Sequence, residues 1–279
     1  MKLALALAAV AVPLLAACPK PRTSAATQPT PLAFDPAKSD PKAVAVVQAG
    51  VEKLGGDAPW QTLKELHFTI SYRHGDQLIQ QNEHWWDRWN GRQYYIGVDV
   101  ATLGGDPDDV KAMEVKQDLF DADATPYVTY DGGQLTRADG ATAAKRAKGF
   151  LTTDLYYLAI THKLTDPGVI LSLDNAEVTM PPEVNACKPS CTTVKVTFEA
   201  GVGTDTWFVN FNNESKLPEV IEQARGAGRI GYLILGWTDA GGLKWPTKLQ
   251  NIGLAAEVIE FDGIKVGEPD DSRYQVIVR

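Results

Sequence analysis

Apolar residues recur at helical spacing just after residue 40. Asp40 (or Ser39) can cap a helix there, and Pro41 suits its first position. Gly55-Gly56 then supplies a C-terminal stop. The apolar face has a period of 3.6 residues and comprises Ala43, Val44, Val47, Val51 and Leu54. The pattern predicts one amphipathic helix of about four turns.

From Leu63 onward the apolar residues recur every second position. One face of this segment comprises Leu66, Phe68, Ile70 and Tyr72, and the other comprises His67, Thr69, Ser71 and Arg73. Such alternation predicts a strand with one buried face. His74-Gly75-Asp76 and Asn90-Gly91 are turn sequences, so hairpins should follow. Strands are predicted over residues 77–89, 92–98, 112–119, 126–130 and 134–137.

A second helix is predicted over residues 141–164, ended by Asp166-Pro167-Gly168. Its apolar face comprises Phe150, Leu151, Leu155, Leu158 and Ala159. Strand patterns then return, over residues 169–173, 176–180, 192–199, 205–212, 217–223, 228–237, 244–260 (in one or two pieces) and 274–278. Because short turns join these strands without intervening helices, they predict an antiparallel meander. We therefore expect an α+β fold, mainly antiparallel β, in a single domain over residues 39–279.

Several short sequence segments follow one another in an order that is also found in a known family. An early helix ends in Gly55-Gly56, Trp60 follows, and Leu63-Lys64-Glu65-Leu66 enters the first strand. Trp207-Phe208-Val209-Asn210 precedes Leu217-Pro218-Glu219-Val220, and the last phrase is Leu243-Lys244-Trp245-Pro246-Thr247-Lys248. Over residues 40–265 this order resembles the periplasmic lipoprotein-carrier and lipoprotein-receptor superfamily (the LolA/LolB type).

That resemblance implies a curled, unclosed β-barrel whose open side is covered by the N-terminal helix and the mid-chain helix. The matching segments are strand-and-turn sequences, so they support a similarity of fold more than a similarity of function. The carriers have characteristic basic residues in their cavity, and these have no match in this chain. This chain has an acidic loop at residues 104–109, and that loop has no counterpart in the carriers.

The first seventeen residues have the pattern of a secretory signal peptide. A lysine at position 2 precedes an apolar run from Leu3 to Leu14, which is shorter than the roughly 20 residues of a spanning helix. The run ends in Leu15-Ala16-Ala17-Cys18, which resembles the lipobox of bacterial lipoproteins. The resemblance implies cleavage before Cys18 and attachment of lipid, palmitate included, to its thiol. The alternative is a chance cysteine after an ordinary signal peptide.

Residues 18–38 would then be the lipidated cysteine and a flexible tether. They are rich in Pro, Thr, Ser and Ala, a composition that cannot form a core. Pro19, and not Asp, follows Cys18, which by resemblance to enterobacterial sorting favours the outer membrane, facing the periplasm. Two or more acyl chains anchor a protein stably, and no second apolar run approaches spanning length, so we expect the lipid to be the membrane anchor of this cell-envelope protein.

Charge and cysteine content limit which partners the protein can bind and which state its cysteines can adopt. There are 27 Lys and Arg against 35 Asp and Glu, without a basic stripe, which argues against a nucleic-acid partner. Cys187 and Cys191 form a pair in an exported protein, which favours a disulfide. Half of a metal site, or two free thiols, are the alternatives for this pair.

Motifs for catalysis or for a cofactor are not found in the sequence. The four histidines are His67, His74, His84 and His162, and they form no metal-binding pair. No Gly-x-Ser-x-Gly elbow and no phosphate-binding loop is present. We therefore expect a protein that is not an enzyme and has no cofactor or metal. A hydrolase using carboxylates remains a weaker alternative.

Aromatic and β-branched residues suggest an apolar cavity inside the curled sheet. The predicted cavity wall comprises Leu66, Phe68, Ile70, Tyr72, Trp85, Trp89, Val194, Val196, Phe198, Trp207, Val209 and Phe211. The plain alternative is that these side chains form the core between helix and sheet. The leading hypothesis is a membrane-anchored lipoprotein that binds a lipid or acylated ligand. The alternative is an envelope interaction protein that presents its tryptophans to a protein or glycan.

Overall fold

The computed structural model describes residues 33–99, 112–121, 123–175 and 186–275. The predicted signal peptide, Cys18, most of the tether, the acidic loop and the strand predicted at 176–180 lie outside these residues. Residues 33–38, which we assigned to the tether, include a short 3₁₀ helix, and Phe34 packs against the core.

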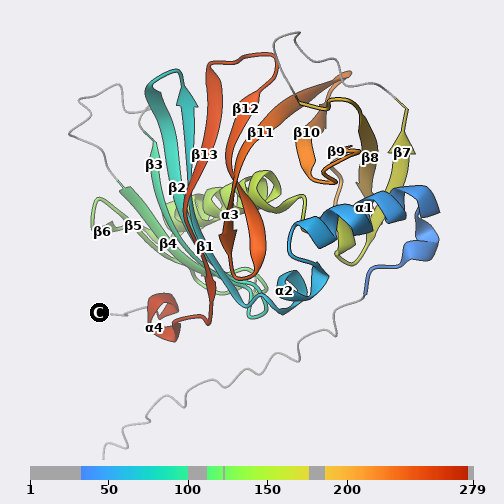
Figure 1. The fold of residues 1–279 in the computed structure, drawn as a ribbon. Coiled ribbons are helices and arrows are strands. Elements are labelled where there is room, and N and C mark those ends of the chain that lie inside the picture. Colours follow the sequence, from blue (N-terminus) through green and yellow to red (C-terminus); the bar gives the residue numbers. More distant parts are fainter. Residues whose placement is uncertain (1–32, 100–111, 122, 176–185, 276–279) are drawn as a thin grey trace, which may run out of the picture. The chain divides into compact units, whose positions relative to one another are not determined.

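Within the described residues, 13 strands form one antiparallel sheet (Figure 1). The strand order is β6-β5-β4-β3-β2-β1-β13-β12-β11-β10-β9-β8-β7, so β6 and β7 are edges and the barrel is not closed. This confirms the predicted open, mainly antiparallel sheet. The strands are β1 (Glu65–His74), β2 (Gln77–Asp87), β3 (Arg92–Asp99), β4 (Ala112–Asp118), β5 (Tyr127–Tyr130), β6 (Gly133–Gln134), β7 (Val169–Asp174), β8 (Cys191–Phe198), β9 (Trp207–Asn212), β10 (Pro218–Arg225), β11 (Gly228–Ala240), β12 (Leu243–Asn251) and β13 (Glu257–Gly267).

The helices agree with the sequence patterns in most respects. They are η1 (Pro36–Lys38), α1 (Pro41–Lys53), α2 (Asp57–Thr62), α3 (Arg137–Ala159), η2 (Lys163–Thr165) and α4 (Asp271–Tyr274). The Asp40 side chain caps α1 by accepting from Lys42 N, as predicted. The short helix α2 was not predicted, and α3 begins and ends a few residues earlier than expected. No helix in the part of the chain that the structure describes is long and apolar enough to span a membrane.

Helix α3 lies inside the curve of the sheet and is the element around which the sheet bends (Figure 1). Leu151, Leu155 and Leu158 of α3 are buried in the main core. The N-terminal half of α3 packs small residues, Ala144 and Ala147, on β3–β5 and forms a second, smaller core. Helix α1 packs against β7 and β8. The mid-chain helix α3 therefore packs on the inner side of the sheet, and α1 packs at the end of the sheet formed by β7 and β8.

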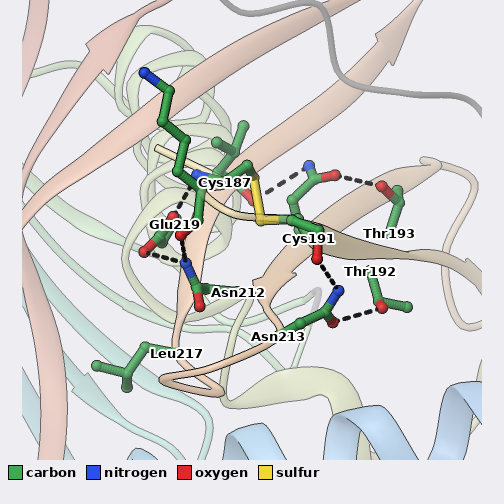
Figure 2. The surroundings of a disulfide bond; sticks show 12 residues. Cys187, Cys191, Thr192, Thr193, Asn212, Asn213, Leu217 and Glu219 are labelled. Atoms are coloured by element: carbon green, nitrogen blue, oxygen red, sulfur yellow. Dashed lines mark hydrogen bonds between the residues drawn. A yellow bond between two sulfur atoms is a disulfide. The ribbon is translucent and has the colours of Figure 1, made fainter. Parts of the chain in front are cut away.

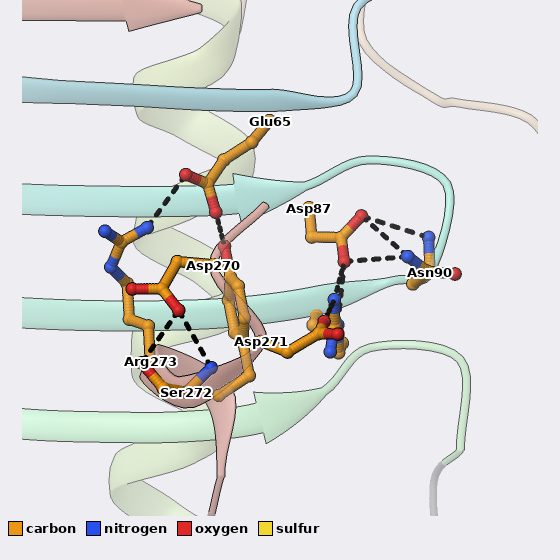
Figure 3. Close-up of polar contacts among 9 residues, drawn as sticks. Glu65, Asp87, Asn90, Asp270, Asp271, Ser272 and Arg273 are labelled. Atoms are coloured by element: carbon orange, nitrogen blue, oxygen red, sulfur yellow. Dashed lines mark hydrogen bonds and ion pairs between the residues drawn. The ribbon is translucent and has the colours of Figure 1, made fainter. Parts of the chain in front are cut away.

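Helix α4 ends at Tyr274, the residue at which we predicted the last strand to start, and residues 276–278 of that predicted strand lie outside the described residues. Figure 3 shows why this turn is fixed. Arg273 Nη1 lies 2.8 Å from Glu65 Oε1, and Tyr274 Oη donates to Glu65 Oε2 at 2.5 Å. Asp271 pairs with Arg92 at 2.7 Å. Side-chain bonds to β1 and β3 thus decide the conformation here, which strand propensity alone does not reveal.

We predict that two glycine-to-alanine changes in helices will have opposite effects on stability. A Cβ at Gly50 of α1 would lie 2.7 Å from Phe211 Cδ1 and 3.2 Å from the Lys216 carbonyl oxygen, whereas nothing lies within 4 Å of one at Gly149 of α3. Gly50→Ala should lower the free energy of unfolding by about 1–3 kcal/mol through overpacking. Gly149→Ala should raise it by about 0.5–1 kcal/mol through helix propensity. Urea denaturation of both variants checks this, and a stabilised Gly50→Ala would contradict the packing.

Candidate functional site

One end of the concave face holds a pocket of about 380 Å³. It opens where β1 and β2 meet at their turn and where β13 begins. The lining residues are Tyr72, Arg73, His74, Ile79, Tyr232, Glu257, Val258 and Ile259. The volume falls within the roughly 300–1,000 Å³ of small-molecule sites. Its side walls are mainly apolar and aromatic, with charged groups among the lining residues.

A larger hollow of about 560 Å³ lies beside α1 and α2. Most of its lining residues are polar, including Glu52, Asp57 and Thr165, and it borders Ala33 at the start of the described chain. It shares no lining residue with the first pocket. The pocket at the end of the concave face is therefore the stronger candidate for an apolar ligand.

Ile79 owes its position in the pocket to an irregularity in the sheet. Near the turn, Arg73 pairs with Leu78. One residue earlier on β1, Tyr72 pairs with Gln80, so Ile79 is left over as the extra residue of a β-bulge. The residues 74–77 form a turn as predicted, but turn chemistry alone does not reveal a bulge placed after it.

A buried carboxyl group of α3 lies directly behind Tyr72. Asp154 is fully buried and accepts from Tyr72 Oη at 2.5 Å and from Asn82 Nδ2 at 2.8 Å. His84 Nε2 lies 2.8 Å from the same carboxyl group. Tyr95 Oη donates in turn to Asn82 Oδ1 at 2.9 Å. Every polar group of this inner patch has a partner, which removes the cost of burying it.

Burial is the main cause of a strongly raised pKa for the Tyr72 hydroxyl, and the adjoining Asp154 carboxyl group adds to it. Tyr232 lies across the pocket, and its Oη is 3.4 Å from Tyr157 Oη. Burial first, and then the hydrogen bond to Tyr157, raise the pKa of Tyr232 as well. Both pocket tyrosines therefore stay protonated at neutral pH.

The opposite end of β1, β2 and β12 is closed. Trp60 Nε1 donates to Asp166 at 2.6 Å, and Arg88 binds the Trp60 carbonyl oxygen at 2.6 Å. The Arg88 guanidinium also lies 4.3 Å from the Trp60 ring centre. His162 packs between Trp60 and Trp245, with ring centroids 5.7 and 4.7 Å away. Packed rings therefore fill the concave side of the sheet at this end.

Most of the predicted cavity-wall residues do face inward, but they are covered. Eight of them are at most 2% exposed: Leu66, Phe68, Ile70, Val194, Val196, Trp207, Val209 and Phe211. They pack with α1 and α3 into the main core. Phe198 lies at its margin, against Tyr156. Of the predicted wall, only Tyr72 lines the pocket. The pocket residues Ile79, Tyr232 and Ile259 were missed, because a bulge and two distant strands bring them together.

Trp85 was predicted on the cavity wall, and this placement is wrong. Because of the bulge, Trp86 and not Trp85 lies opposite Leu66 on the inner face. Trp85 lies on the outer face, stacked between His67 and Tyr94 with ring centroids 4.5 and 4.7 Å away. The rings therefore cover one another's faces across three strands.

Trp89 does not belong to the wall either. Strand β2 ends at Asp87, two residues earlier, and the Arg88 guanidinium lies 4.7 Å from the Trp89 ring centre. Trp89 is thus part of the packing around Arg88 at the closed end. The Asn90-Gly91 turn ends β2 sooner than the run of tryptophans suggested.

Cys187 and Cys191 form a disulfide, as the sequence favoured (Figure 2). Cys187 N donates to Glu219 Oε2 at 2.5 Å, and Asn212 Nδ2 donates to Glu219 Oε1 at 3.0 Å. These bonds tie the disulfide loop to β9 and β10. With both sulfur atoms in the disulfide, the metal alternative for this pair has no thiolate ligands.

Comparisons with known proteins give distant structural likenesses. A DUF1329 family protein from Desulfovibrio piger is similar with a TM-score of 0.46 and 13% identity, over 85% of this chain and 98% of that one. MucB is similar with a TM-score of 0.26 and 13% identity, over 86% of this chain and 64% of that one. The MucA/MucB complex of Pseudomonas aeruginosa gives a TM-score of 0.23 at 13% identity, over 82% and 60%.

The chain thus spans less than two thirds of the MucB chains that it matches. No protein-family model and no curated protein sequence matches it. The function is therefore argued below from the geometry of this chain.

His162 makes stability depend on pH. Burial lowers its pKa to about 4, although its ring donates from Nε2 to the Lys244 carbonyl oxygen at 2.9 Å. In the unfolded chain it titrates near 6.5, so between pH 6.5 and 4 only the unfolded state gains a proton. We predict that stability falls as pH is lowered through this window, by up to about 3 kcal/mol from this group.

The check is the free energy of unfolding of wild type and His162→Asn at pH 7 and pH 4.5. The variant should be less stable at pH 7 but should lose less on acidification. Equal losses in the two proteins would show that His162 does not carry the effect.

Proposed function

We propose that this protein binds one apolar, chain-like ligand, a lipid or an acylated molecule, in the pocket at the open end of its curled sheet. The observation that carries the proposal is the pocket itself, bounded by Tyr72, Ile79, Tyr232 and Ile259. We propose binding without catalysis. Asp154 and His84, which could otherwise serve as acid and base, lie in the core with every bond directed at a protein partner.

The size of the pocket suits a single chain. Its 380 Å³ corresponds to about a dozen water-sized groups of roughly 30 Å³ each. Burying one methylene group is worth about 0.8 kcal/mol. A medium-length alkyl chain therefore provides enough apolar contact for useful affinity, and the volume of the pocket suits one such chain.

We further propose that the protein acts as a lipoprotein of the cell envelope. The lipobox-like sequence supports attachment at Cys18, and residues 19–32 would connect the anchor to the domain. A lipid-binding domain held close to a membrane meets its ligand at a high local concentration. The proposed site is the outer membrane, on its periplasmic side.

The alternative function, an aromatic surface for a protein or glycan, receives less support. Sugars stack on the open faces of aromatic rings. The faces of Trp85 are covered by His67 and Tyr94, and Lys116 lies 5.1 Å from the Tyr94 ring centre. Because both faces of the central Trp85 ring are covered, the stack is better explained as support for the sheet.

We predict that native mass spectrometry of the domain from residue 31 onward will show a bound lipid, or uptake of one fluorescent fatty-chain probe per molecule. Ile79→Trp places a bulky ring at the half-buried bulge position and should reduce probe affinity at least about tenfold. Leu235→Trp, at a 51% exposed position of β11 outside the pocket, is the matched control and should leave binding unchanged. A clean apo mass without probe uptake would overturn the proposal.

Cys18→Ala tests the anchor independently of the pocket. In a bacterial host the wild-type protein should take up labelled palmitate and fractionate with membranes, because its thiol carries lipid. The variant should lose the label and be released in soluble form. Unchanged membrane fractionation of Cys18→Ala, with no label on the wild type, would contradict lipidation.

A further inference from the structure

The inner boundary of the pocket is polar, although its side walls are apolar. Tyr72 and Tyr232 line it from opposite sides, and Tyr157 adjoins Tyr232 with its hydroxyl oxygen 3.4 Å away. Tyr157 belongs to α3, so the helix adds its hydroxyl group to the two that strands β1 and β11 supply. A purely hydrocarbon end of a ligand would leave this cluster unmatched.

The Tyr72 hydroxyl group already uses its proton in a hydrogen bond within the protein. The proton is donated to Asp154 Oδ1 at 2.5 Å, and the remaining Asp154 oxygen receives Asn82 Nδ2 and approaches His84 Nε2. A hydroxyl group that donates its proton keeps lone pairs for accepting. Toward any further group, Tyr72 is therefore an acceptor and needs a donor.

The Tyr157–Tyr232 pair provides a hydrogen-bond donor, which complements the acceptor at Tyr72. Either hydroxyl can donate to the other, but the pair contains two protons and its mutual bond uses one. The second proton is left to be donated. The polar boundary of the pocket thus presents an acceptor and a donor to the same ligand group.

The cations that line the pocket are poorly placed to recognise an anion. Arg73 Nε is bonded to Glu260 at 2.8 Å, and its Nη1 donates to the Asp76 carbonyl oxygen at 3.3 Å. Glu257 lines the same pocket, and His74 is exposed at its edge. A carboxylate only accepts hydrogen bonds, so it would meet acceptors at Tyr72 and at Asp154 behind it.

Resting on the proposed function, we infer that the ligand is a neutral amphiphile whose hydroxyl group enters the pocket first, such as a long-chain alcohol or the glycerol end of a monoacylglycerol. Its hydroxyl group donates to Tyr72 Oη and accepts from the Tyr157–Tyr232 pair. The alkyl chain then passes between Ile79 and Ile259 toward the mouth of the pocket. This orientation is the reverse of one in which a lipid is held by its tail.

The test compares three probes of equal chain length by isothermal titration calorimetry at pH 7.5. Decanol both donates and accepts, methyl decanoate is neutral but only accepts, and decanoate is an anion. The expected order of affinity is decanol above methyl decanoate above decanoate. A net hydrogen bond of about 1 kcal/mol predicts a difference of roughly fivefold between the first two.

Variants assign the selectivity to the hydroxyl cluster. Tyr72→Phe removes the acceptor that only decanol can use, and it should reduce the preference for decanol over methyl decanoate to less than about twofold. Tyr232→Phe removes the donor that lines the pocket, so it should weaken the binding of both neutral probes and leave their ratio unchanged. Tyr130→Phe, on the exposed edge of the sheet, is the matched control and should keep the full preference. Thermal unfolding of each variant confirms that the fold is intact.

The outcomes separate this inference from the proposed function. If all three probes bind equally, or decanoate binds best, the inference is wrong and the pocket still binds apolar chains. The inference also fails if Tyr72→Phe keeps the wild-type preference, or if Tyr232→Phe binds both neutral probes as tightly as the wild type. If no probe binds, the proposed function itself is overturned.

Discussion

The fold depends on the burial of one carboxyl group in the middle of α3. A helix placed inside a curled sheet must match the inner face of every strand that it crosses, and the inner face of β2 carries Asn82 and His84 instead of apolar side chains. The Asp154 carboxyl group accepts hydrogen bonds from Asn82 and from Tyr72 of β1, and His84 Nε2 lies within hydrogen-bonding distance of it. Unpaired, each of these buried groups would cost on the order of 1–3 kcal/mol. The network therefore fixes both the rotation of α3 and its position along the sheet.

The bulge at Ile79 decides which residues of β2 form that inner face. A one-residue shift in pairing exchanges the two faces of a strand, and it turns His84 and Trp86 inward while Trp85 turns outward. The same shift leaves Ile79 at the edge of the concave face, where it lines the pocket. One irregularity thus accounts for the polar network, the outer ring stack and one wall of the candidate site.

The two ends of the concave face differ for a physical reason. At one end Trp60, Trp245 and His162 pack against one another, and Asp166 neutralises the Arg88 guanidinium that lies over them. At the other end the tyrosines of β1 and β11 stand apart and a cavity remains between them. The candidate pocket therefore lies at the end that the packed rings do not fill, with the hydroxyl groups of Tyr72 and Tyr232 among its lining residues. Binding at one open end is the behaviour that this asymmetry supports.

Local patterns located most elements of the fold, but not the short helices α2 and α4. Helical spacing and capping located α1, alternation located β1, turn sequences located the hairpins, and the absence of intervening helices implied an antiparallel meander. The pairing of Cys187 with Cys191 followed from their number and the expected export. These features depend on neighbours in the sequence, so a single chain displays them. The candidate site depends on contacts between residues far apart: the bulge that redirects Trp85 and Ile79, the helix that covers Leu66 and Phe68, and the approach of Tyr232 to Tyr72 across the sheet. Only the tertiary structure decided these, because register and helix position are set by burying polar partners together, and no local pattern records which distant partner each residue will meet.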